Sequence, residues 1–183
     1  MKTSVRALAT LLFFTLLTGL VYTGAVTGVS AVAFNRQANG SLVVSGGRVV
    51  GSELIAQNFK GPGYFWPRPS AADFNPLPSG GSNYAPSSAE LLGKIKERKK
   101  LGMTRDLLFA SASGLDPHIS PEAAFDQIER IASARGLRDN QLSAVRALIL
   151  RHVEERQYGM LGEGRVNVLR LNLALDEETR IAK

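Results

Sequence analysis

The first part of the chain is an unbroken apolar run. Between Arg6 and Arg36 lie 29 residues without a charged side chain, and most are Leu, Val, Ala, Phe, Gly or Thr. A helix rises ~1.5 Å per residue, and ~20 apolar residues suffice to cross a bilayer. The pattern therefore predicts a transmembrane helix over residues 9–32, preceded by a short N-terminus of residues 1–8.

A cleaved signal peptide is the alternative for this run. Lys2 and Arg6 form a basic start, and Ala31-Val32-Ala33 fits a small-x-small cleavage site. The apolar core of a signal peptide spans only ~7–15 residues, however, and this run is much longer. The length favours a retained membrane helix.

Basic residues around the apolar run indicate its orientation. Lys2, Arg6 and the terminal amine lie within six residues, whereas Arg36 and Arg48 are spread more widely on the other side. Positive charge concentrates in the cytoplasmic flank of membrane helices. We therefore expect a cytoplasmic N-terminus and an extracytoplasmic domain formed by residues 33–183.

Two glycines inside the predicted membrane helix have a spacing that matters for packing. Gly24 and Gly28 form a small-xxx-small pattern, which lets a second helix approach closely in lipid. Such glycines are also common in membrane helices that have no partner. The pattern makes this face a candidate for helix packing.

After the apolar run, helical periods alternate with short strand-like segments and turn residues. Together these segments predict an α+β protein in which one N-terminal transmembrane helix precedes a single mixed α/β extracytoplasmic domain. The first expected elements are a hairpin of Leu42-Val43-Val44 and Arg48-Val49-Val50 around Ser45-Gly46-Gly47, and then an ordered aromatic loop from Phe59 to Pro86. A helix is expected from about Ser88 to Leu101, with Ser87 as N-cap and Glu90 in the third position. The remaining expected elements are a buried strand over Asp106–Ser111, helices from Ser120 to Gly136 and from Asn140 to Arg156, and a final strand in residues 165–175.

Composition limits the chemistry. The chain has 183 residues, of which 44% are hydrophobic, so a wholly disordered protein is excluded. It has no cysteine, which removes disulfides, thiol catalysis and thiolate metal sites. The net charge of +6 is modest, and its one dense run, in residues 94–100, fits the solvated C-terminal end of a helix. This basicity does not require a nucleic-acid partner.

Few residues are suited to catalysis. Ser113, Asp116 and His118 in SGLDPHIS contain the residue types of a hydrolytic triad, and a membrane-anchored hydrolase is the alternative function. Pro117 and the helix start that follows favour turn and capping roles for the same residues. His152 shares a helical face with apolar residues, which favours a hydrogen-bonded core histidine. No pair of histidines has a short metal-ligand spacing, so no metal site is predicted.

The segment SGGSNYAP, residues 79–86, has two interpretations. Consecutive glycines and hydroxyls suit a phosphate cradle, but they also make ordinary turns. The segment lacks the lysine and the helix start of a G-x-x-x-x-G-K-[ST] phosphate loop, which favours a structural turn. Its members that remain candidates for an interface are Ser79, Gly80, Gly81, Asn83 and Tyr84.

The aromatic loop raises a similar choice. Tyr64, Trp66 and Arg68 lie within five residues, and side chains of these types often anchor protein interfaces. They are equally suited to packing within their own domain, so the sequence leaves both roles open.

Several stretches, taken in order, resemble one family. The stretches are GSELIAQNF from Gly51, YFWPRPSA from Tyr64, SGGSNYAPSS from Ser79, SGLDPHISPEAA from Ser113 and LILRHVEERQYGMLGEGRVNVLRLNLAL from Leu148. Each is weak by itself, but the five in sequence are specific. They resemble the C subunit (KdpC) family of the Kdp potassium-transporting ATPase, and the resemblance covers nearly the whole chain.

The resemblance implies a non-catalytic subunit of a bacterial inner-membrane complex that takes up potassium with high affinity. In that family the C subunit assembles with a channel-like, potassium-binding A subunit, a P-type ATPase B subunit that hydrolyses ATP, and a small single-helix F subunit. It is described as needed for assembly and as a catalytic chaperone that raises the ATP affinity of the B subunit. ATP and potassium are thus associated with the complex, and no cofactor is predicted for this chain.

Overall fold

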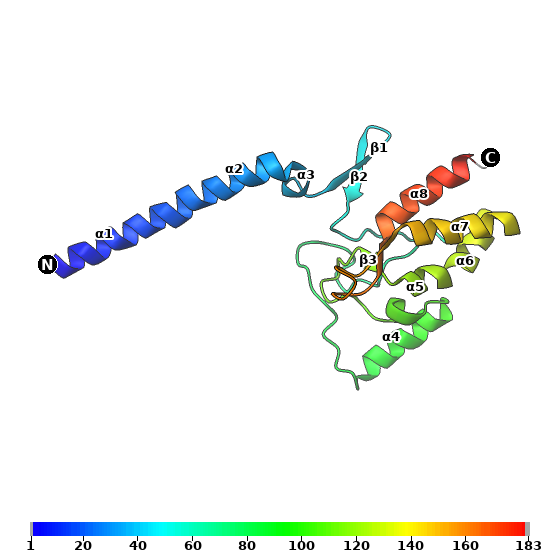
Figure 1. Cartoon of the computed structure of the whole chain (residues 1–183). Helices are drawn as coiled ribbons and strands as arrows, with labels where there is room; N and C mark the ends of the chain where they lie inside the picture. Colours follow the sequence, from blue (N-terminus) through cyan, green and yellow to red (C-terminus); the bar gives the residue numbers. More distant parts are fainter. Residues whose placement is uncertain (1, 182–183) are drawn as a thin grey trace. The chain divides into compact units, whose positions relative to one another are not determined.

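The computed structural model describes residues 2–181. Two compact units divide the chain, one up to Leu42 and the other from Val43 onward. Figure 1 colours both by sequence, with the long N-terminal helix in blue. The structure is mixed helix and strand, as predicted, and each unit is described by itself below.

The N-terminal unit is dominated by one apolar helix. Its parts are α1 (Lys2–Leu16), a π-helical stretch η1 (Leu17–Tyr22) and α2 (Thr23–Ala33), followed by the short α3 (Asn35–Ala38). The continuous 32 residues from Lys2 to Ala33 form the single helix, within residues 2–181, that is long and apolar enough to cross a membrane. The helix begins seven residues before the predicted span of residues 9–32.

Threonine hydroxyls accompany the wide turns of this helix. Thr18 Oγ1 donates to Phe14 O at 2.7 Å, and Thr23 Oγ1 donates to Thr18 O at 3.0 Å. A Cβ atom added at Gly24 or Gly28 meets nothing within 4 Å among residues 2–181, apart from the adjoining backbone of the helix itself. These two glycines therefore leave space for a close neighbour, and their role in helix packing stays a prediction.

The second unit contains two small sheets. β1 (Leu42–Ser45) and β2 (Arg48–Ser52) form the predicted hairpin, with Gly46 and Gly47 at φ of 58° and 77° in its turn. Two consecutive positive φ angles match the twist of a tight hairpin turn, which glycine adopts without strain. The other sheet has the order β3-β5-β4, where β3 is His118–Ile119, β4 is Val153–Glu154 and β5 is Arg165–Asn167.

Both pairings in the three-stranded sheet are antiparallel. Ile119 and Val153 lie opposite Val166 from its two sides. Four helices accompany this sheet: α5 (Pro121–Asp126), α6 (Ile128–Arg135), α7 (Asp139–Arg151) and α8 (Val168–Ile181). Of these, α5 and α8 pack against β5, and α7 packs against the other three helices. Figure 1 shows α7 and α8 packed side by side, while α4 (Ala89–Lys100) lies at the edge of the unit and has no buried residue. Core side chains come from the sheet, these helices and the aromatic loop, and include Phe65, Leu107, Ile119, Ile131, Ile149, Val166, Leu171 and Leu175.

Two predicted helix boundaries are confirmed and one shifts. Ser120 caps α5 by accepting from Ala123 N at 3.2 Å, with Pro121 in the first turn, and Gly136 ends α6 in the left-handed region at φ 64°. Ser88 is the N-cap of α4, since its hydroxyl accepts from Leu91 N at 3.1 Å, so the prediction of Ser87 was wrong by one residue.

Two predicted strands are wrong. The segment over Asp106–Ser111 instead begins within a 3-10 turn, η2 (Arg105–Leu108), in which the Asp106 carboxylate accepts hydrogen bonds from both the backbone and the hydroxyl of Ser120. The last predicted strand ends at Asn167, and residues 168–181 are helical. Val168, Leu171 and Leu175 recur at helical spacing and are all buried, so the alternation that predicted a strand was shared with an amphipathic helix.

Two predicted helices are shorter than expected. The one over residues 120–136 is broken at Gln127 into α5 and α6, and the one over residues 140–156 ends at Arg151. His152 therefore lies at the C-cap rather than within the helix, with Nδ1 2.9 Å from Leu148 O. After His152 the chain leaves the helix and enters β4, an outer strand of the three-stranded sheet.

Candidate functional site

The aromatic segment, residues 61–68, is held in place by side chains from helices instead of by a neighbouring strand. Phe65 N donates to Asn172 Oδ1 at 2.8 Å, and Asn172 Nδ2 donates back to Phe65 O at 3.0 Å. Both residues are fully buried. One carboxamide thus satisfies both backbone groups of Phe65, which would otherwise be unpaired in the core.

Gln127 repeats this arrangement on the next residue. Trp66 N donates to Gln127 Oε1 at 2.8 Å, and Gln127 Nε2 donates to Trp66 O at 3.3 Å. Gln127 lies at the break between α5 and α6. Successive residues of the segment are therefore paired with amides on opposite sides, as the central strand of a sheet would be with its two neighbours.

Two arginines of α6 complete the contacts. The Arg130 guanidinium lies 3.7 Å from the centre of the Trp66 ring and donates to Tyr64 O at 3.0 Å. Arg135 donates to Gly63 O at 2.6 Å and lies 4.8 Å from the centre of the Tyr64 ring. Burial lowers the pKa of Arg130 to about 10, which still leaves it charged at neutral pH. A guanidinium thus makes a cation–π contact with each of the two rings.

The side chains of Tyr64 and Trp66 also bond within the domain. Tyr64 OH donates to Asp176 Oδ2 at 3.2 Å, and Trp66 Nε1 donates to Gly61 O at 2.9 Å. Both residues are half-buried. Of the two roles that the sequence left open, the structure displays the internal one, and contact with a partner stays a prediction for these residues.

Arg68 connects the aromatic segment to the SGLDPHIS loop. Its Nη1 pairs with Asp116 Oδ2 at 3.4 Å and its Nη2 donates to Ala110 O at 3.3 Å. Its Nε is buried and has no hydrogen-bond partner within residues 2–181. Ser111 N donates to Pro69 O at 3.0 Å, so the two loops run together here.

The glycine turn, residues 79–81, packs against the same loop. Gly80 N donates to Ser113 O at 3.0 Å and Ser79 Oγ donates to that oxygen at 2.8 Å. A side chain on Gly81 would lie 2.9 Å from Ala112 O, so glycine permits this close backbone approach. The Gly80 N–H that a phosphate cradle would need is engaged by protein, which favours the turn. Asn83 and Tyr84 follow with exposed side chains.

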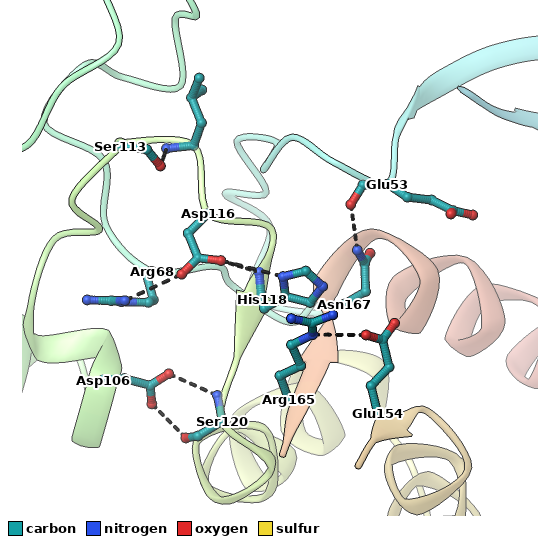
Figure 2. A network of polar contacts seen from close by, with 11 residues as sticks. Glu53, Arg68, Asp106, Ser113, Asp116, His118, Ser120, Glu154, Arg165 and Asn167 are labelled. Atoms are coloured by element: carbon teal, nitrogen blue, oxygen red, sulfur yellow. Dashed lines mark hydrogen bonds and ion pairs between the residues drawn. The ribbon is translucent and has the colours of Figure 1, made fainter. Parts of the chain in front are cut away.

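Only two of the three hydrolytic candidates come together. His118 N donates to Asp116 Oδ1 at 3.0 Å, and His118 Nδ1 lies 3.6 Å from that oxygen. Ser113 Oγ instead accepts from Leu115 N at 3.1 Å within its own turn. Figure 2 shows the Asp116 carboxylate between Arg68 and His118, with the Ser113 hydroxyl directed at the backbone of its own loop. The arrangement favours the turn and capping roles.

The neighbouring polar contacts in Figure 2 are structural in the same way. Asn167 Nδ2 donates to Glu53 O at 2.8 Å, which ties β5 to the segment after β2, and Arg165 pairs with Glu154 at 2.9 Å across β4 and β5. No group of three or more His, Asp or Glu side chains able to hold a metal occurs within residues 2–181.

Asp116 gives the domain a predicted acid-sensitive contact. Burial by itself raises the pKa of its carboxyl, but hydrogen bonds from His118 and the charge of Arg68 outweigh this and hold the pKa below its usual 3.8. The carboxylate therefore stabilises the fold above pH ~4, and this stabilisation is lost as pH falls through the lowered pKa. Asp116→Asn should be less stable than the parent at pH 7, with a difference that shrinks below pH ~4. Urea unfolding at pH 3–7, followed by fluorescence of Trp66, the single tryptophan, measures it. A pH-independent difference would contradict the assignment.

Sequence reasoning missed the side chains that hold the aromatic segment. Gln127, Arg130 and Arg135 fall within the predicted helix of residues 120–136, and Asn172 falls within the segment of residues 165–175 that was predicted as a strand. The available signal was a polar residue at a position where the helical period requires an apolar one. Asn172 directly follows Leu171 and precedes the core residue Leu175, and Gln127 directly precedes Ile128. Such a buried carboxamide needs hydrogen-bond partners.

The sequence matches the family model described as KdpC, K+-transporting ATPase, c chain, over residues 4–177. Among proteins named potassium-transporting ATPase KdpC subunit, that of Geobacter sulfurreducens is 50% identical over 188 residues, covering 96% of this chain and 98% of the relative. That of Dechloromonas aromatica is 47% identical, covering 98% and 100%. That of Paraburkholderia phytofirmans is 51% identical over 176 residues, covering 89% and 90%.

One apolar helix long enough to span a membrane, joined to a small α+β unit, is consistent with a single-pass membrane protein. The family model covers most of both parts. The chain belongs to the KdpC family, the c chain of K+-transporting ATPases, as the ordered sequence motifs predicted.

Proposed function

We propose that this chain is a non-catalytic subunit that the potassium-transporting ATPase needs for assembly, and that it raises the ATP affinity of the ATP-hydrolysing subunit indirectly. The observation that carries this proposal is the use of the polar side chains of the domain. Asp116, Gln127 and Asn172, which are the types that catalysis or ligand binding would use, are engaged in holding loops. A rigid domain of this kind is suited to being a contact surface.

The proposed partners are the channel-like, potassium-binding A subunit, the ATP-hydrolysing B subunit and the small F subunit. The proposed location is the bacterial inner membrane, with residues 1–8 cytoplasmic, residues 9–32 in the bilayer and residues 33–183 outside. Gly24 and Gly28 contribute a helix-packing face, which is supported by the open space beside them in the part of the chain that the structure describes.

With this orientation the glycine turn does not reach cytoplasmic ATP. An effect on ATP affinity must then arise because the subunit binds one conformation of its partners better than another. The exposed side chains of Asn83 and Tyr84, beside the firmly held glycine turn, provide a contact point for such binding. Tyr64, Trp66 and Arg68 contribute through their solvent-facing edges.

Omitting this chain from cells that produce the other subunits tests the assembly role. We expect the remaining subunits to purify as an incomplete complex, with potassium-stimulated ATP hydrolysis lost or with a raised KM for ATP. Adding the chain back on a second plasmid should restore both. A complete and fully active complex without the chain would contradict the proposal.

The proposed orientation has its own test. The parent has no cysteine, so Ser87→Cys and Ser4→Cys each supply a single thiol at an exposed position. In intact spheroplasts we expect an impermeant maleimide to label Ser87→Cys, and Ser4→Cys only after lysis. The opposite pattern would place the domain on the side of ATP and remove the reason for an indirect effect.

A further inference from the structure

Three exposed apolar side chains, here called the apolar tip, lie in the middle of the connection between β4 and β5: Tyr158, Met160 and Leu161. Their exposed fractions are 90%, 79% and 59%. Single exposed apolar residues are ordinary on protein surfaces, but three large ones within four residues of one turn are not. Because these side chains are exposed, they add no buried apolar area to the core of the domain.

The apolar tip is held rigidly. Gln157 N donates to Leu161 O and Leu161 N donates to Gln157 O, both at 2.9 Å. Gly159 N and Met160 N donate to Arg156 O and Gln157 O at 3.1 Å. Four backbone hydrogen bonds thus close the turn, so the backbone that carries these side chains would lose little conformational freedom on binding a partner.

Tyr158 has an unfavourable backbone conformation. Its φ is +54°, in the left-handed region that suits glycine or asparagine and disfavours a bulky side chain. The Tyr158 side chain is also the most exposed of the three. Neither the local backbone nor the domain core explains a tyrosine here, and strained residues of this kind concentrate at functional sites.

The charges beside the apolar tip indicate what covers it. Between residues 155 and 163 the charged side chains are Glu155, Arg156 and Glu163, a net charge of −1 with no lysine. Loops that insert into an anionic lipid surface carry Lys or Arg around their apolar residues. Tyr and Met, by contrast, are enriched in the buried centres of protein interfaces.

We propose that the apolar tip is a docking anchor that inserts into an apolar pocket, with a neutral or basic rim, on another subunit of the potassium-transporting complex. This inference rests on the proposed assembly role and adds a defined surface to it. Tyr158 fills the pocket, and Met160 and Leu161 exclude water around it. The hydrogen-bonded turn presents all three without rearrangement.

Substitution in the whole complex tests the anchor. In the full chain we would combine Tyr158→Asn, Met160→Ser and Leu161→Ser, and compare it with Leu150→Gln, which alters a side chain on α7 that is 63% exposed. We expect the triple variant to bind the other subunits at least about tenfold more weakly, because burial of even one large apolar side chain is worth about a tenfold change. The Leu150→Gln chain should bind like the parent.

Folding is monitored separately. Asparagine tolerates the left-handed region, so Tyr158→Asn alone should leave the urea midpoint of the domain unchanged or raise it while weakening binding. A merely structural role for Tyr158 would lower the midpoint. Equal binding by the triple variant and the parent would overturn the proposal, and if omission of the whole chain still disrupts the complex, the assembly role survives that result.

Cross-linking identifies the occupant. Tyr158 is replaced by the photoreactive p-benzoylphenylalanine in cells that produce the whole complex, with the same replacement at Leu150 as control. An adduct with another subunit, specific to position 158, is expected. Adducts only with lipid, an adduct with a second copy of this chain, or no adduct would each overturn the proposal.

Discussion

Replacing Asn172 with leucine is expected to lower the free energy of unfolding of the domain by about 3 kcal/mol. The carboxamide of Asn172 is the hydrogen-bond partner of both Phe65 N and Phe65 O, and both residues are fully buried. The leucine side chain branches at Cγ like that of asparagine but is larger, and it neither donates nor accepts a hydrogen bond. Two backbone groups then stay unpaired away from water, and each costs ~1–3 kcal/mol.

Urea unfolding of the full chain in detergent, followed by Trp66 fluorescence, measures this loss. Trp66 directly follows Phe65, so its emission reports on the segment that Asn172 holds. Asn140→Leu is the matched control, since Asn140 is exposed on α7 and the same change there should stay within about 0.5 kcal/mol. If Asn172→Leu unfolds at the parent's urea concentration, the buried amide does not hold the segment.

Gln127 extends the same reasoning to the shape of the domain. Its carboxamide pairs with Trp66 from the point where α5 ends and α6 begins. The sequence pattern alone predicted one continuous helix over residues 120–136, whereas the structure has a break at Gln127. The break and the pairing are therefore two aspects of one interaction between distant parts of the chain.

Elements determined by neighbouring residues were predictable from the sequence. The apolar helix, the Gly46-Gly47 turn, the Ser120 cap and the Gly136 helix end all follow from local chemistry, and all are present. Phe65 and its partner Asn172 are separated by 107 positions in the sequence, and Trp66 and its partner Gln127 by 61 positions. No local period contains that information, so the side chains that hold the aromatic segment were missed.

The start of α8 illustrates a different limit. Residues 166–173 alternate apolar and polar side chains well enough for a strand, but Val168, Leu171 and Leu175 also fit a helical period. Asn167 decides the transition, because its side chain caps the helix by accepting from Arg170 N at 3.2 Å and also donates to Glu53 O at 2.8 Å. A cap residue that also serves a distant loop is hard to recognise from its neighbours.

Gly114→Ala is expected to lower the free energy of unfolding by about 2–4 kcal/mol, the combined cost of a left-handed alanine and of a close contact. Gly114 has a φ of +71°, and a side chain there would lie 2.9 Å from Gly80 O and 3.1 Å from Ser70 Oγ. The obstructing Gly80 oxygen belongs to the backbone of the glycine turn. Relief of the clash would require the turn and the SGLDPHIS loop to separate, which breaks the bonds from Gly80 N and Ser79 Oγ to Ser113 O.

The glycine turn supplies its own matched pair of variants. Gly81→Ala places a methyl group 2.9 Å from Ala112 O and should cost about 1–3 kcal/mol, whereas a side chain on Gly80 meets nothing within 4 Å. Gly80→Ala should therefore be neutral or slightly stabilising, because it only restricts the unfolded chain. A phosphate cradle predicts another order, in which both variants fold like the parent and both lose anion binding. Urea midpoints of Gly80→Ala, Gly81→Ala and Gly114→Ala, each measured with and without millimolar phosphate, separate the two. Loss of stability in the order Gly114, Gly81, Gly80, with no effect of phosphate, establishes that the glycines serve the contact between two loops.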